Sequence, residues 1–150
     1  MPGSAGAAER VPDAIYAAIK RHRAACIGWD AAGDVRSDFP EGPEPLTDRE
    51  LEQREMLDDA VDSARAVLNK AAVDLINTVP TTFGGIASAI AYMQRQMRDD
   101  GTFMPFDIEF QYDVGYEGDS AVVLGWLDIF LNAIASAVSG LDRAVEVVAL

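Results

Sequence analysis

The sequence predicts an all-α protein in which four helices pack as an antiparallel, bundle-like domain. Apolar side chains recur at intervals of three and four residues in four separate blocks, which is the spacing of one helix face. Hydrophobic residues make up 49% and charged residues 25% of the 150-residue chain, a composition and a length typical of one globular domain. We expect a disordered terminus over residues 1–11, which are small, polar and unpatterned, and a single helical domain over residues 12–150.

The first helix is expected to start at Pro12, because proline suits the first helical position, with Asp13 near the positive end of the helix dipole. One face of this helix carries five side chains at steps of 4, 3, 4 and 3: Ile15, Ile19, His22, Cys26 and Trp29. His22 and Cys26 lie one turn apart, as a thiolate–imidazolium nucleophile requires. Their apolar neighbours disfavour both charged forms, so we interpret the pair as core residues.

The second helix has the clearest start signal in the chain. Thr47 and Glu50 are spaced as a capping box, in which each side chain accepts a hydrogen bond from the backbone amide of the other residue. An apolar seam at steps of 4, 3, 4, 3 and 4 follows: Leu57, Val61, Ala64, Leu68, Ala71 and Leu75. Pro80 is expected to end the helix, because the residue before a proline avoids the helical conformation.

The third helix is expected to begin after Thr81 or Thr82 and to end at Gly101. Its apolar stripe is Phe83, Ile86, Ile90, Met93 and Met97. Beyond it, apolar and polar residues alternate strictly over residues 106–114, a pattern typical of a strand. No second strand is predicted, so two alternatives remain: a short β segment that pairs with a copy of itself, and an irregular aromatic segment packed over the helices, which we favour.

The fourth helix is expected over residues 121–141, which are nearly all apolar. Its polar residues form one narrow stripe, which predicts a central core helix that touches water along one edge: Asp128, Asn132, Ser136 and Ser139. The length also suits a membrane span. However, Asp128 would lie within that span and no basic cluster sets an orientation, so we predict no membrane association.

Charge and composition exclude several function classes. Twelve Lys and Arg residues stand against 25 Asp and Glu residues, a formal charge of −13, which disfavours a nucleic-acid partner. Cys26 and His22 are the only residues of their kinds, so an intramolecular disulfide and the multi-cysteine and multi-histidine metal sites are excluded. We predict no metal and no cofactor. The N-terminal sequence has no signal-peptide pattern, which predicts a cytoplasmic protein.

Two stretches carry recognisable motifs: residues 12–25 (PDAIYAAIKRHRAA), and residues 78–101, which open with TVPTT and contain Tyr92-Met93. They resemble the DPIxAAIxxHRAA-like opening helix and the PTTxxG third-helix start of a group of small bacterial helical proteins of uncharacterised activity. The resemblance implies an all-helical bacterial protein and no particular chemistry. It singles out His22, Arg23, Thr81 and Thr82, and we expect His22 to accept a hydrogen bond from one of the two threonines.

The expected function is a non-enzymatic interaction module, in its simplest form a homodimer, with no protein partner identified. The basis is an excess of apolar surface over what four helices can bury. The predicted interface residues are Phe106, Phe110, Tyr112 and Trp126. The alternative is a small-molecule-binding or enzymatic role in a pocket between helices, with the ligand residues His22, Arg23, Tyr92 and Arg95. A third alternative, an antitoxin-like or phage-associated accessory role, rests only on small size and acidity.

Overall fold

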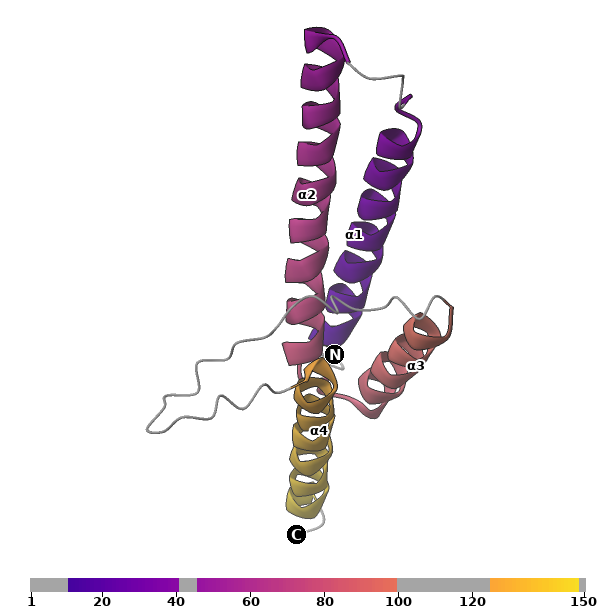
Figure 1. The fold of residues 1–150 in the computed structure, drawn as a ribbon. Coiled ribbons are helices and arrows are strands. Elements are labelled where there is room, and N and C mark those ends of the chain that lie inside the picture. The colour runs from indigo at the N-terminus through magenta and orange to yellow at the C-terminus, as the bar shows by residue number, and fades with distance from the viewer. Residues whose placement is uncertain (1–10, 41–45, 100–124, 149–150) are drawn as a thin grey trace, which may run out of the picture.

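A computed structural model describes residues 11–40, 46–99 and 125–148. In these ranges it has four helices and no strand, which confirms the all-α prediction for them: α1 (Ala14–Ser37), α2 (Asp48–Asn77), α3 (Phe83–Asp99) and α4 (Trp126–Val148). α1 and α2 lie side by side over most of their length, and α3 lies beside the first part of α1 (Figure 1). α4 contacts α2 and α3 near the point where α2 ends, and then extends away from the α1–α2 pair.

The helix starts combine one confirmed prediction with one correction. The capping box of α2 is present: the Glu50 amide donates to the Thr47 hydroxyl at 3.4 Å, and the Thr47 amide donates to the Glu50 carboxylate at 2.8 Å. The sequence predicts that α1 starts at Pro12, but the helix begins at Ala14 and Pro12 precedes the N-cap residue. Asp13 is the N-cap, because its carboxylate accepts a hydrogen bond from the Ile15 amide at 3.2 Å.

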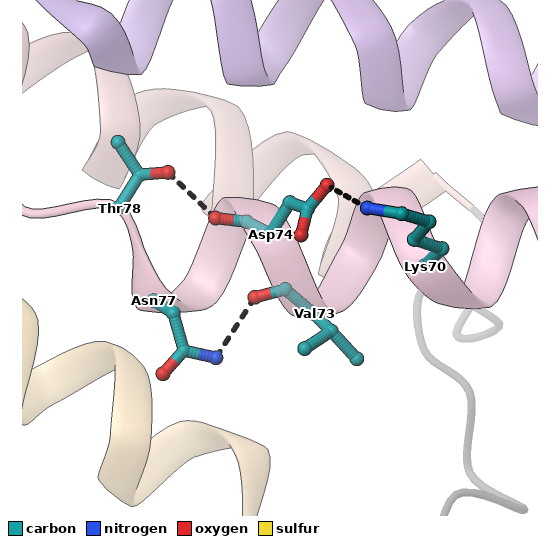
Figure 2. Close-up of polar contacts among 5 residues, drawn as sticks. All are labelled: Lys70, Val73, Asp74, Asn77 and Thr78. Carbon is teal, nitrogen blue, oxygen red and sulfur yellow. Dashed lines mark hydrogen bonds and ion pairs between the residues drawn. The ribbon is translucent and has the colours of Figure 1, made fainter.

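The end of α2 agrees with the expected stop before Pro80, since the helix ends at Asn77. Figure 2 shows how side chains satisfy the carbonyl groups of the last turns, which lack partners within a helix. The Thr78 hydroxyl donates to the Asp74 carbonyl at 2.6 Å, and the Asn77 amide group donates to the Val73 carbonyl at 2.9 Å. The chain then turns through the buried Pro80 toward the start of α1.

The hydrophobic core lies where the first half of α1, the end of α2, α3 and the start of α4 meet. Its members are Ile15, Ala18, Ile19, Ala72, Leu75, Ile76, Ala89, Tyr92, Met93 and Phe130. Along α1 and α2, fewer side chains are buried away from this junction, because no other helix of the described ranges accompanies the pair there. Trp29 in α1 is exposed, and the predicted seam of α2 is buried only at Ala71 and Leu75. In α3, the predicted stripe residues Phe83 and Ile90 are exposed.

The prediction that the fourth helix is central is wrong for the residues described. α4 continues past Gly140 to Val148, and among those of its side chains that the structure describes, Phe130, Ala133 and Ala137 are buried. An adjoining face is open, with 44% exposure at Leu127, 53% at Leu131 and 41% at Val138. An almost wholly apolar helix gives no signal of which face receives a neighbour. Within the described ranges, no helix is both long and apolar enough to cross a membrane.

Parts of the sequence-based predictions fall on residues 1–10 and 100–124, which the structure does not describe. They include most of the predicted disordered terminus, the alternating segment at 106–114, and the predicted interface residues Phe106, Phe110 and Tyr112. Of Trp126, only its position as the first residue of α4 is described.

The carboxylate of Asp13 joins α1 to α3. While one of its oxygens caps α1, the other accepts hydrogen bonds from the Thr81 amide at 2.9 Å, the Thr82 amide at 2.9 Å and the Thr82 hydroxyl at 2.8 Å. The Thr82 hydroxyl in turn accepts from the Gly85 amide at 2.9 Å and so caps α3. One negative charge therefore lies at the starts of two helices, where both helix dipoles stabilise it.

The ionisation of Asp13 follows from these contacts. Burial opposes the charged form, but the hydrogen bonds from Thr82, Ile15 and Thr81 outweigh it, and the pKa of Asp13 lies below its ordinary value. Gly85 is required beside this carboxylate, because a Cβ at that position would lie 2.0 Å from the Asp13 oxygen. The contact thus fixes how closely α3 approaches α1.

Replacing Gly85 with alanine should destabilise the fold. The added methyl group must displace the Asp13 carboxylate, so we expect Gly85→Ala to lower the free energy of unfolding by roughly 2–3 kcal/mol in chemical denaturation. Gly33→Ala in α1 is the control: nothing lies within 4 Å of its Cβ position, and a gain of about 0.5–1 kcal/mol is expected. Equal effects of the two substitutions would contradict the close contact between Asp13 and Gly85.

Candidate functional site

A buried histidine connects α1 to α3 at a second point. His22 is only 1% exposed, and its Nδ1 atom lies 2.8 Å from the Tyr92 hydroxyl, with which it shares a hydrogen bond. The two rings meet edge to face, with centroids 5.8 Å apart and an interplanar angle of 80°. The Sγ atom of Cys26, one turn along α1, lies 3.5 Å from the same nitrogen.

The expected bond between His22 and Thr81 or Thr82 is corrected by this arrangement. Nine residues of helix raise His22 by about 14 Å above the start of α1, out of reach of both threonines. The backbone amides of the two threonines donate hydrogen bonds to the Asp13 carboxylate instead, and His22 is hydrogen-bonded to Tyr92. The sequence separations of these contacts, 69 residues for Asp13–Thr82 and 70 for His22–Tyr92, show that α1 and α3 run parallel from a common start.

All three groups of this cluster are neutral near pH 7. Burial lowers the pKa of His22 to about 4. Burial also raises the pKa of Tyr92 to about 12, against the opposing effect of the Arg23 guanidinium. The pKa of Cys26 is raised as well, by burial and by the charge of Asp30. These directions disfavour a thiolate–imidazolium nucleophile and suit a structural role for His22 and Cys26.

An open pocket of about 500 Å³ lies between α1 and α3, beside this cluster. Eight of the described residues line it: Tyr16, Ile19, Lys20 and Arg23 from α1, and Ser88, Ala91, Tyr92 and Arg95 from α3. Three of them are cationic, and none of the described lining residues is acidic. The Arg23 guanidinium carbon lies 5.1 Å from the centre of the Tyr92 ring, a cation–π contact that orients the guanidinium group.

The structure brings together the four residues that the sequence singles out as ligand residues. Arg23, Tyr92 and Arg95 line the pocket. His22 does not line it but is hydrogen-bonded to the Tyr92 hydroxyl. Lys20, Tyr16 and Ser88 are lining residues that the sequence-based prediction does not include. Helical spacing is the signal for two of them, because Tyr16 and Lys20 are four residues apart and Lys20 and Arg23 are three apart on one helix face.

A second groove has a different lining. It lies between α1 and α2, has a volume of about 530 Å³, and is lined mainly by small apolar residues such as Ala25, Gly28 and Ala64. Arg21 borders it from α1, while Lys70 there already pairs with Asp74 at 2.9 Å. Within the described ranges, no three His, Cys, Asp or Glu side chains are grouped so that they could hold a metal ion. Within the described part of the chain, the α1–α3 pocket therefore gathers three cationic side chains with no acidic side chain in its lining.

Comparison of the chain with protein-family models, with curated proteins and with solved structures gives no match.

The low pKa of His22 predicts a loss of stability in mild acid. In the unfolded state, where the histidine pKa is near 6.5, His22 is protonated as the pH falls below that value. In the folded state it stays neutral until about pH 4. Stability present above pH 6.5 should therefore fall by about 1 kcal/mol between pH 7.5 and 5.5. We expect His22→Asn, which keeps a hydrogen-bonding partner for Tyr92, to remove most of this slope in denaturation curves. An unchanged slope in the variant would show that another group is responsible.

Proposed function

We propose that the chain binds a small organic anion in the pocket between α1 and α3. The observation that supports this is the convergence of Lys20, Arg23 and Arg95 on a pocket with no acidic side chain among its described lining residues. These are three of only twelve basic residues in a chain of net charge −13. In such a chain, cations without acidic neighbours in the same pocket call for a functional explanation.

The chemistry of the lining suits carboxylate or phosphate groups. Three like charges in one pocket repel each other, and a bound anion relieves that repulsion. Arginine presents a planar fork of donors that matches a carboxylate or phosphate, and lysine adds a compact positive charge. The volume of about 500 Å³ lies within the usual range for small-molecule sites.

The pocket is held in shape before any ligand arrives. His22 fixes the Tyr92 hydroxyl, Tyr92 orients the Arg23 guanidinium, and Asp13 fixes α3 on α1. Such preorganisation lowers the entropy lost on binding. Because the only thiol and the only imidazole are neutral and occupied in packing, we propose a binding protein rather than an enzyme.

Anion binding can be tested with variants matched in charge. Calorimetry with phosphate, citrate and aromatic acids should detect binding that weakens at least tenfold in Arg23→Gln and in Arg95→Gln, since a charge-assisted hydrogen bond contributes about 1.5–3 kcal/mol. Arg21→Gln is the control, because Arg21 lies on the same helix but borders the other groove. If the three variants lose affinity equally, the effect is one of net charge and the proposed site is incorrect.

Self-association is a second candidate function, favoured by one specific observation. One exposed face of α4 carries Leu127, Leu131 and Val138 at helical spacing, beside its buried face. We propose that a second copy covers this face and that the antiparallel, bundle-like arrangement of helices is completed in the homodimer. The bacterial source and the cytoplasmic location remain predictions from the sequence.

Light scattering after size-exclusion chromatography tests this second candidate. We expect a dimer at micromolar concentration, and a shift toward monomer in Leu131→Gln because a polar group replaces buried apolar surface. Met56→Gln, at a strongly exposed position of α2, should leave the mass unchanged. A monomeric wild-type chain would exclude the proposal.

A further inference from the structure

The two ends of the α1–α3 pocket differ in chemistry. Because α1 and α3 run parallel from a common start, lining residues early in both helices lie at one end and later ones at the other. Tyr16, Ile19 and Ser88, which are uncharged, line the early end, and Lys20 follows Ile19 directly on α1. Arg23 and Arg95 line the late end. Two of the three cations thus lie at the late end of the pocket, and Lys20 lies between the two ends.

The uncharged end offers a surface for a flat apolar group. The Tyr16 side chain is 46% exposed although its hydroxyl packs near Gly84, where a Cβ would lie 3.1 Å from it. Its position is therefore defined while much of its surface remains available. Ile19, which is buried, contributes an aliphatic wall beside it. Aromatic rings favour stacked or edge-to-face contacts with a second ring.

The charged end extends this surface. Arg23 is exposed, and its guanidinium carbon lies 5.1 Å from the centre of the Tyr92 ring. An exposed guanidinium group held near this ring can also pack on another planar group, because delocalised guanidinium groups pack well on aromatic faces. The pocket therefore combines places for a planar body with cationic donors for an anionic group.

We infer that the ligand class of this pocket is an aromatic anion, in which a ring lies between Tyr16 and Arg23 and a phosphate or carboxylate group is held by Arg23, Arg95 and Lys20. This inference rests on the proposed anion-binding function and specifies its ligand. A purely inorganic anion leaves the Tyr16–Ile19 end in water, and a neutral aromatic molecule leaves the three cations without a partner. An aromatic anion satisfies both ends at once.

Three small probes separate these contributions in calorimetry. Phenyl phosphate carries both parts, inorganic phosphate carries only the anion, and phenol carries only the ring. We expect phenyl phosphate to bind at least tenfold more tightly than inorganic phosphate, and phenol to show no measurable binding. Benzoate distinguishes the two anion types. Benzoate binding as tight as that of phenyl phosphate indicates a site for carboxylates, and weaker benzoate binding indicates a site for phosphates. Either result supports an aromatic anion.

Substitution at Tyr16 links this difference to the pocket. Tyr16→Ser should lower the affinity for phenyl phosphate to that for inorganic phosphate. Tyr16→Phe keeps the ring and should keep the difference in affinity between the two ligands. Arg23→Gln should weaken both ligands. Equal affinity of phenyl phosphate and inorganic phosphate for the wild-type chain would overturn the aromatic inference and leave anion binding intact. Absence of binding by every anion would overturn both.

Discussion

The carboxylate of Asp13 determines where α3 lies on α1, and the pocket between these helices depends on that placement. The side chain caps α1 with one oxygen and receives three hydrogen bonds from Thr81 and Thr82 with the other. Two helix dipoles and four donors favour the charged form over the cost of burying it. Gly85 completes the contact, because only a residue without a Cβ lets α3 approach this closely.

The common start of α1 and α3 has a direct consequence for charge. Parallel helices in fixed register bring Lys20 and Arg23 of one helix opposite Arg95 of the other. The net charge of −13 lowers the long-range cost of placing these cations together, but it also repels anions that approach from solution. A ligand must therefore be recognised at short range, where the arginine forks and the Tyr16 and Tyr92 rings lie. Salt should affect such short-range contacts less than it affects steering from a distance.

Local signals allowed much of the fold to be predicted. The capping box of Thr47 and Glu50 spans four residues, so the start of α2 follows from the sequence alone. The double role of Asp13 could not be predicted, because its second set of donors lies 68 and 69 residues away and an N-cap carboxylate looks the same without them. Arg23 and Arg95, which the sequence analysis selects as ligand residues, lie together in one pocket, but the pocket that joins them depends on helix register. The exposed position of α4 could not be predicted, since its apolar residues surround the helix and mark no single buried face.

A pH titration by nuclear magnetic resonance tests the central contact most directly. The side-chain carbon of Asp13 and the backbone amides of Thr81 and Thr82 would be followed together from neutral to acidic pH. The structure predicts one shared midpoint below the ordinary value for an aspartate, with all three signals shifting as the carboxylate takes up its proton. An Asp13 signal that titrates as in an unfolded peptide, with threonine amides that do not respond, would contradict the account of how α1 and α3 are joined.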